Sequence, residues 1–215
     1  RSRSGVFHRA PTVEPTALPE RCRECDDRLS FAYDAHIAAV RCEACDRTLL
    51  EYPFEPGAFE DRSVREAARA FDRRTRSIWT AGLDGLCTVC TGRVEAEYAT
   101  PDELLTNLTR YDDYFSADRP VVAALDCTNC SFYSYVPVGT AALRDPVLAG
   151  TMAEKGRPLA DRRLWALPFV VDGDRETVLD AEPRRVSVLV HAGADEGVEV
   201  VLDEDLDVAE VVRRR

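Results

Sequence analysis

The sequence predicts an α+β protein: two four-cysteine zinc-ribbon-like units joined by a helix, then a second helix and a C-terminal antiparallel β-hairpin or sheet. Three observations support this class. They are four Cys-x-x-Cys pairs, an amphipathic segment between the second and third pairs, and alternating valine-rich segments near the C-terminus. With 215 residues, the chain is long enough for one or two domains with buried cores.

All eight cysteines fall into the four pairs, and none is left over. Two residues between cysteines allow one tight turn to direct two thiolates at the same tetrahedral ion, so four such turns supply two closed zinc sites. We therefore expect two structural Zn²⁺ ions per chain. The predicted ligands are Cys22, Cys25, Cys42 and Cys45 for the first ion, and Cys87, Cys90, Cys127 and Cys130 for the second.

The first zinc ribbon is predicted at residues 21–56, after a linker. Residues 1–20 carry three prolines and no hydrophobic periodicity, which is typical of a linker. Sixteen residues separate Cys25 from Cys42, a length that suits a hairpin returning the second turn to the first. The expected strands are residues 29–33, 37–40 and 48–52.

A connecting helix is predicted within residues 57–85. Ser63 and Glu66 form an S-x-x-E capping box, and Gly82 and Gly85 end the pattern. Apolar residues at steps of three and four form one face, which we interpret as a packing face rather than a ligand site. This face consists of Val64, Ala67, Ala68, Phe71, Ile78 and Trp79.

The second ribbon is predicted at residues 86–138 and is split by an insertion at residues 99–119. The insertion begins with an N-cap at Thr100 followed by proline, which predicts a helix start. Thirty-six residues separate Cys90 from Cys127, which is long for a simple ribbon. The expected strands are residues 94–98, 121–125 and 131–138.

The last segment, residues 139–215, is predicted to contain a helix and a β-hairpin. Residues 140–154 have a helical pattern, in which Pro146 marks either a break or a new first turn. Alternating valines predict a hairpin between residues 186–190 and 198–202, and residues 208–212 could add an edge strand.

Structural zinc fits these cysteine pairs better than the other chemistries that cysteine pairs support. A redox Cys-x-x-Cys opens a helix after a strand, whereas these pairs are flanked by hairpin-like sequence; iron–sulfur clusters also accept four cysteines. A catalytic zinc needs an open position, commonly with histidine ligands, and the three histidines His8, His36 and His191 are not in ligand-spaced pairs. Phosphate loops, dinucleotide fingerprints and nucleophile elbows are also missing from the sequence. We therefore expect a protein that is not an enzyme.

The charge balance is acidic, with a formal net charge of -11, and Lys155 is the only lysine among 28 cationic residues. One interpretation of the acidic charge is that the protein avoids nucleic acid. We favour another interpretation, in which the protein comes from an organism with a GC-rich genome and a salt-adapted cytoplasm, where an acidic surface stays hydrated. No apolar run approaches the ~20 residues of a membrane span, and no signal-peptide pattern opens the chain. We expect a soluble, cytoplasmic protein with no membrane partner.

The order of several short motifs resembles the C-terminal regions of haloarchaeal ArsR-type winged-helix transcriptional regulators. The resemblance covers about residues 5–213. The motifs are the segment 22–45, Tyr52-Pro-Phe-Glu-Pro-Gly-Ala-Phe59, Phe71-Asp-Arg-Arg, Asp84-Gly-Leu-Cys87 and Trp165-x-Leu-Pro-Phe169 with the hairpin after it. The resemblance implies a DNA-binding winged helix upstream, absent here, and a homodimer or another protein partner. The start at Arg1 agrees with a fragment or processed product.

The chain departs from this family directly after each cysteine pair. The family commonly has glycine there, which lets backbone N–H groups reach the thiolates. This departure puts the regularity of the four turns in doubt, though not the ligands. The residues present are Asp26, Asp46, Thr91 and Ser131.

Three functions are compatible with these features. The first is an accessory region of a transcription regulator, for dimerisation or sensing, with DNA binding supplied upstream. The second is a stand-alone zinc-ribbon adaptor that binds other proteins. The third is direct nucleic-acid binding by the ribbons, for which acidic residues interrupt the basic stripe. The arginines near the first site are Arg21, Arg23, Arg41 and Arg47.

Overall fold

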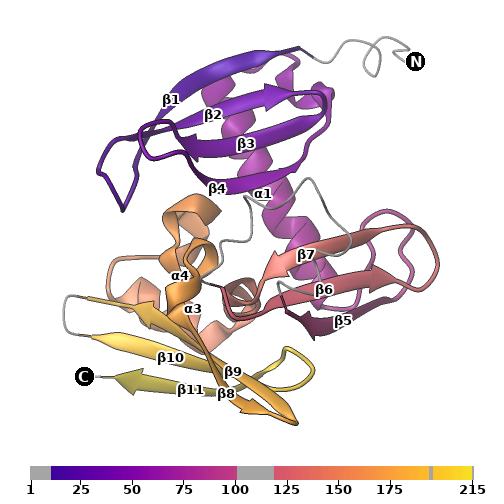
Figure 1. Ribbon diagram of the computed structural model, residues 1–215, viewed down its shortest axis with the longest axis vertical. Helices are drawn as coiled ribbons and strands as arrows, with labels where there is room; N and C mark the ends of the chain where they lie inside the picture. Colours follow the sequence, from indigo (N-terminus) through magenta and orange to yellow (C-terminus); the bar gives the residue numbers. More distant parts are fainter. Residues whose placement is uncertain (1–10, 101–118, 194–195, 215) are drawn as a thin grey trace. The chain divides into compact units, whose positions relative to one another are not determined.

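The computed structural model describes residues 11–100, 119–193 and 196–214, and it has the predicted α+β class (Figure 1). Its described strands form three antiparallel sheets. The chain divides into two compact units, residues 1–75 and 76–215, and the boundary falls within helix α1 (Val64–Leu83). One sheet belongs to the first unit and two belong to the second.

The first unit contains a four-stranded sheet whose neighbours in sequence are also neighbours in space. Its last three strands confirm the strands predicted for the first ribbon. Because consecutive strands are antiparallel, the turns at residues 22–27 and 43–46 lie at the same end of the sheet. The strands are β1 (Val13–Arg21), β2 (Arg28–Asp34), β3 (Ile37–Cys42) and β4 (Arg47–Pro53).

Strand β1 corrects the predicted linker for residues 13–20, while residues 1–10 of that prediction lie outside the described part of the chain. Residues 13–20 pair with β2, for example Thr16 with Phe31, and Leu18 is buried. Pro15 and Pro19 cannot donate to a ladder, but β1 is an edge strand with two irregularities in its register, where prolines are tolerated. The prolines led to the prediction of a linker. A strand still forms because an edge strand pairs on one side only, so some of its residues need no backbone N–H donor.

An aromatic cluster forms the core of the first unit. The ring of Phe71, on α1, lies 5.9 Å from the ring of Phe31 and 5.3 Å from that of Phe54. Tyr33 packs against Phe59 in the short 3-10 helix Pro56–Phe59, with ring centroids 4.5 Å apart. The Tyr33 hydroxyl donates to the Phe54 carbonyl at 3.0 Å, so this buried polar group is satisfied.

Helix α1 (Val64–Leu83) confirms the helix predicted within residues 57–85 and ends next to Gly82, one of the two glycines expected to end it. Of the predicted apolar face, all members except the half-buried Val64 are buried. The capping box is present as well. The Ser63 hydroxyl donates to the Glu66 carboxylate at 2.7 Å, and the Ser63 backbone N–H donates to it at 2.9 Å. These bonds from Ser63 lower the pKa of Glu66.

We expect Ser63→Ala to lower the free energy of unfolding by about 1 kcal/mol, because the helix loses its N-cap hydroxyl. Thr80→Ala is the matched control, since the Thr80 hydroxyl bonds only to helix carbonyls, at 2.9 Å to Arg76. Denaturant unfolding followed by circular dichroism measures both changes. An equal effect of the two substitutions would show that the capping box contributes nothing specific.

In the second unit, a three-stranded sheet matches the strands predicted for the second ribbon. Its order is β5-β6-β7, comprising β5 (Val94–Ala99), β6 (Val122–Cys127) and β7 (Tyr133–Pro137). Residues 94–99 pair with 127–122 without a break in register, so the two halves of the split ribbon join. The helix start predicted at Thr100, together with most of the insertion, falls on residues 101–118, outside the described part of the chain.

The predicted helix at residues 140–154 is two elements. A 3-10 helix, Val138–Arg144, is followed by α3 (Pro146–Glu154), so Pro146 begins a new first turn. Asp145 is the N-cap of α3, and its carboxylate accepts from the Leu148 N–H at 2.6 Å. Proline at the first helical position needs no hydrogen-bond acceptor, which explains the restart.

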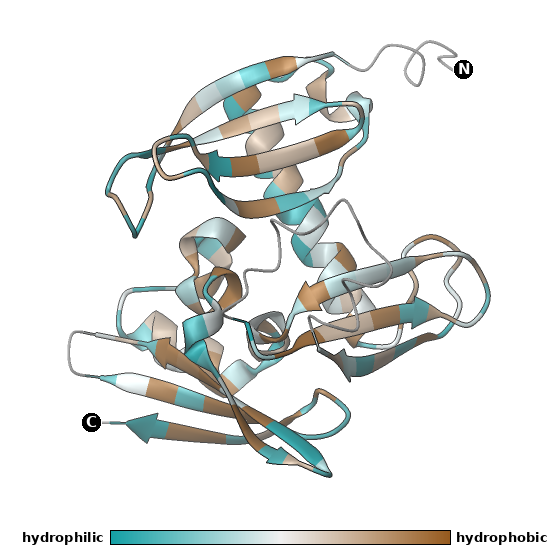
Figure 2. Cartoon of the chain, viewed as in Figure 1, coloured by the Kyte–Doolittle hydropathy of each residue, from teal (hydrophilic) through white to brown (hydrophobic). Residues whose placement is uncertain are grey.

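The C-terminal sheet has the order β11-β10-β9-β8. It consists of β8 (Glu176–Ala181), β9 (Arg184–His191), β10 (Gly197–Leu202) and β11 (Val208–Arg214). The predicted hairpin is confirmed by β9 and β10, which pair Val188 with Val200, and the edge strand is confirmed by β11. Figure 2 shows hydrophobic segments along β9 and β10. Strand β8 was not predicted, because it is mostly exposed and half of its residues are polar.

Short helices and a buried ion pair fill the space beside the C-terminal sheet. Arg119 forms an ion pair with Glu176, both side chains being almost fully buried, and also donates to the Val170 carbonyl at 3.0 Å. A Cβ on Gly139 would lie 1.6 Å from the Phe169 carbonyl oxygen, so this position requires glycine. The helices are Leu159–Asp161, Leu164–Ala166, α4 (Pro168–Val171) and Gly173–Arg175.

Candidate metal centres

The first four predicted ligands come together in the first unit. The Sγ atoms of Cys22 and Cys45 lie 3.7 Å apart, and those of Cys25 and Cys42 lie 3.4 Å apart. All four Sγ atoms lie within 4.8 Å of one another. Two of the cysteines follow or end strands β1 and β3, and the turns after them supply the other two, so the sheet itself fixes the site.

The second cluster has the same layout in the second unit. Cys87 and Cys130 have Sγ atoms 3.7 Å apart, Cys90 and Cys127 have Sγ atoms 3.5 Å apart, and all four lie within 4.8 Å. Cys127 ends strand β6, while Cys87 is the residue after Leu86, which bridges to Arg93. In both clusters the first cysteine of each pair is buried, whereas the second is exposed or partly exposed.

These distances fit a tetrahedral metal ion. Four sulfurs about 2.3 Å from a zinc ion are about 3.8 Å apart, close to the observed 3.4–3.7 Å. A disulfide would need about 2.05 Å, and all eight thiols are free. Each of the two clusters can therefore hold one metal ion. With four sulfur donors, such a site is coordinatively closed, so it offers no position for water or substrate.

Backbone hydrogen bonds form the turns around the thiols. In the first turn the Asp26 N–H donates to the Cys22 carbonyl at 3.0 Å, and in the third the Thr91 N–H donates to the Cys87 carbonyl at 2.9 Å. Asp26 and Thr91 have left-handed φ values of 59° and 60°, as has Asp46, at 55°. The glycine expected at these positions is thus replaced without loss of the turn. At the fourth such position, Ser131 does not share this conformation.

A strained threonine suggests a substitution that should stabilise the second site. Left-handed backbone costs a non-glycine residue about 1–2 kcal/mol, and threonine is also β-branched. We expect Thr91→Gly to raise the free energy of unfolding by up to about 1 kcal/mol, after the greater freedom of glycine in the unfolded chain is subtracted. Ser131→Gly is the matched control and should be neutral or destabilising. Thermal unfolding of the metal-loaded protein compares them, and a loss of stability in Thr91→Gly would contradict the strain argument.

N–H donors stabilise the thiolate forms that a metal requires. The Asn129 side chain and the Gly92 N–H donate to Cys90 Sγ at 3.6 and 3.4 Å, and these bonds lower the pKa of Cys90 to about 6. Burial raises the pKa of Cys42, but hydrogen bonds from Cys45 and other neighbours outweigh it and bring the pKa to about 7. One thiol in each cluster, Cys42 or Cys90, is therefore easier to ionise than a free cysteine, whereas burial and the neighbouring thiols raise the pKa of Cys45 and of Cys130 to about 12.

Asn129 and Gly92 are site residues that the sequence analysis missed. A Cβ on Gly92 would lie 2.9 Å from the Asn129 Cβ and 3.1 Å from Cys90 Sγ, so only glycine lets its backbone come so close. The available signals were a glycine two residues after Cys90 and an amide side chain within the fourth cysteine turn.

Among the described residues, the structure has no helix that is long and apolar enough to cross a membrane.

Comparisons with known proteins place the chain in a family. A search of curated proteins found no match, and a search of solved structures found none either. A family model described as "Domain of unknown function (DUF7351)" matches residues 19–208. Since this match covers most of the 215 residues, the chain belongs to the DUF7351 family.

Proposed function

We propose that both four-cysteine clusters hold zinc in a structural role and that the protein is not an enzyme. The observation that carries the proposal is the pair of four-sulfur groups, each with all Sγ atoms within 4.8 Å of one another and two Sγ–Sγ distances of 3.4–3.7 Å. Zinc prefers four thiolates in structural sites, and its binding free energy then adds to the folding free energy. His36, close in sequence to the first cluster, instead lies 3.9 Å from the Glu55 carboxylate.

The proposal includes two zinc-ribbon-like units joined by a helix. Helix α1 contains the boundary between the two compact units, so its first part belongs with the first cluster and its last part with the second. Gly85, with φ of 79°, and the bonds of residues 84–86 to the last turn end the helix just before Cys87. The helix end therefore leads directly into the second set of ligands.

In the organism, we propose that this zinc-binding region serves a cytoplasmic archaeal transcription regulator, for dimerisation or sensing. DNA binding would be supplied by a winged helix upstream, as the resemblance to the ArsR-type regulators implies. Ion pairs near the first cluster support the proposal that DNA is bound by the upstream winged helix and not by this region, because they neutralise arginines that could otherwise bind phosphates. Arg21 lies 3.5 Å from Asp26, Arg47 lies 3.2 Å from Glu24, and Arg41 pairs with Glu51.

The alternative is a stand-alone adaptor that binds other proteins within a larger complex. The net charge of -11 favours it over direct nucleic-acid binding, since acidic surfaces repel phosphates. This alternative requires the same structural zinc sites but no winged helix, so the two candidates differ in one property. Only the regulator binds duplex DNA when its complete reading frame is expressed.

A salt-titrated DNA-binding experiment tests the proposal. The 215-residue chain and its complete reading frame are compared for binding to duplex DNA from the gene's own upstream region. We expect the reading frame to bind with a steep salt dependence and the chain alone to show a slope near zero. A reading frame without a winged helix, or one that does not bind DNA, would favour the adaptor. Salt-dependent binding by the chain alone would contradict both candidates.

A further inference from the structure

One face of the sheet β5-β6-β7 in the second unit combines carboxylates with tyrosines. The register places Glu95 opposite Asp126 and Glu97 opposite Ala124, while β7 places Tyr133 beside Asp126 and Tyr135 beside Ala124. These side chains share one face because they occupy alternate positions on each strand. The acidic–tyrosine face is defined as Glu95, Glu97, Ala124, Asp126, Tyr133 and Tyr135.

The opposite face of this sheet packs inside the second unit. Val94, Leu125 and Val136 are buried there, and the Leu125 side chain lies against Gly82 of helix α1, where an added Cβ would be 2.6 Å from it. The acidic–tyrosine face, in contrast, has exposed carboxylates, and Tyr133 is 58% exposed. The sheet is thus amphipathic. Its outward face nevertheless carries the aromatic rings of Tyr133 and Tyr135, although a polar side chain at either position would be enough to keep the face in contact with water.

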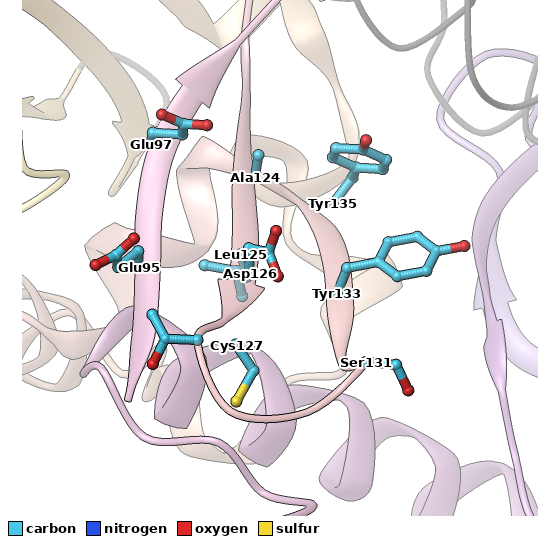
Figure 3. Close-up of a pocket in the computed structure, with 10 residues that line it drawn as sticks. Glu95, Glu97, Ala124, Leu125, Asp126, Cys127, Ser131, Tyr133 and Tyr135 are labelled. Carbon is cyan, nitrogen blue, oxygen red and sulfur yellow. The ribbon is translucent and has the colours of Figure 1, made fainter. Parts of the chain in front are cut away.

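A hollow of about 800 Å³ lies over this face and is lined by all six of its residues. In Figure 3, Glu95 and Glu97 project from β5 on one side of the hollow, and the rings of Tyr133 and Tyr135 lie on the other side, on β7. The two rings meet edge to face, with centroids 6.3 Å apart. Glu95 and Asp126 make one end of the hollow acidic. At the other end, Ala124 and Tyr135 pack on the small buried cluster of Ala99 and Val122, so this end is more apolar and has one carboxylate, that of Glu97.

The carboxylates of this face repel one another. Glu95 and Asp126 are directly opposite across the strands, and Glu97 follows on the same side of β5. Like charges in opposite positions destabilise a sheet. Within the described ranges, none of these three carboxylates forms an ion pair or a side-chain hydrogen bond. A cationic ligand would neutralise this repulsion, and the three carboxylates would accept hydrogen bonds from it.

We propose that the acidic–tyrosine face binds an extended, arginine-rich segment of a partner protein. Guanidinium groups bind carboxylates through two parallel hydrogen bonds and stack on aromatic rings, so they match both kinds of side chain here. The arginine groups lie at the acidic end and along the tyrosines, while the apolar end takes an aliphatic side chain of the same segment. Charge excludes nucleic acid from this face. The proposal goes beyond the function proposed for the zinc sites and holds for a regulator or an adaptor alike.

Fluorescence anisotropy with a labelled peptide of alternating arginine and serine tests the proposal. The lysine–serine counterpart is measured with it, both in 0.2 M and in 1 M KCl, since salt screens exposed charges. The test variant combines Glu95→Gln, Glu97→Gln and Asp126→Asn. Its control combines Asp161→Asn, Glu204→Gln and Glu210→Gln, which changes the net charge equally at exposed sites. Tyr133→Leu tests the aromatic contribution alone, and metal content shows that each variant is folded.

We expect the test variant to weaken peptide binding about tenfold and its control by about twofold or less, since three contact pairs are lost only in the former. Tyr133→Leu should weaken arginine-peptide binding about two- to fivefold, and the lysine peptide should bind more weakly than the arginine peptide. If the two triple variants weakened peptide binding equally, the effect would come from the net charge of the protein and not from this face, and the proposal would be overturned. Absence of peptide binding, or stoichiometric displacement by Mn²⁺ indicating a cation site, would overturn it as well.

Discussion

Replacement of Cys42 by serine is expected to release one of two zinc ions and to unfold the first unit. Cys42 is fully buried at the end of β3, and its sulfur lies 3.4 Å from that of Cys25. Apparent zinc-binding free energies in small structural sites are about 10–16 kcal/mol, whereas whole domains are stable by only about 5–15 kcal/mol. The aromatic cluster of this unit therefore does not compensate for the lost ion.

The second unit should keep its structure in this variant. It has a cluster of its own, and its hairpin of β9 and β10 buries Val186, Val188 and Val200. Hydrogen exchange resolves the two outcomes, with protection lost in β2 and β3 and retained in β9 and β10. Ala44→Ser is the matched control, because it adds a hydroxyl to the same turn at an exposed position that is not a ligand. Equal loss of protection in both units would show that they unfold as one.

Phe71→Ala is expected to lower the free energy of unfolding by about 3–5 kcal/mol, which is the usual cost of removing a buried aromatic ring from a packed core. Phe71 is 0% exposed and contacts two other rings, those of Phe31 and Phe54. The substitution leaves a cavity next to both, and the rigid sheet beneath them limits how far they can close it.

The control for Phe71 is on the same helix. Arg69 is exposed two residues earlier, so Arg69→Ala tests the effect of changing a helix residue without opening a cavity. It should change stability by no more than about 0.5 kcal/mol. Chemical denaturation of the zinc-loaded variants measures both. A cost below about 1 kcal/mol for Phe71→Ala would show that the aromatic cluster is not the core of the first unit.

The elements that the sequence predicted best are those in which one physical signal dominates. The cysteine pairs predicted both clusters because a fixed spacing is required for two thiols to share one ion. Helix α1 followed from its capping box and apolar stripe, and β9 and β10 followed from alternation with period two. In each case local sequence and long-range packing favour the same structure.

The missed elements depend on long-range contacts that override local signals. Pro15 and Pro19 disfavour a strand in the local sequence. Strand β1 nevertheless forms, because its backbone pairs with that of β2 at the edge of the sheet. Strand β8 has little apolar pattern, and it forms by pairing with β9, beside the ion pair of Glu176 with Arg119. The acidic–tyrosine face is also a property of register, because Glu95, Asp126 and Tyr133 come from three separate strands.

The central claim, two structural zinc ions each held by four thiolates, is tested most directly by metal analysis of freshly purified protein combined with X-ray absorption at the zinc edge. The account predicts two zinc ions per chain and a first coordination shell of four sulfur atoms at about 2.3 Å. A single metal per chain, nitrogen or oxygen ligands in the first shell, or disulfides between the paired cysteines would contradict it.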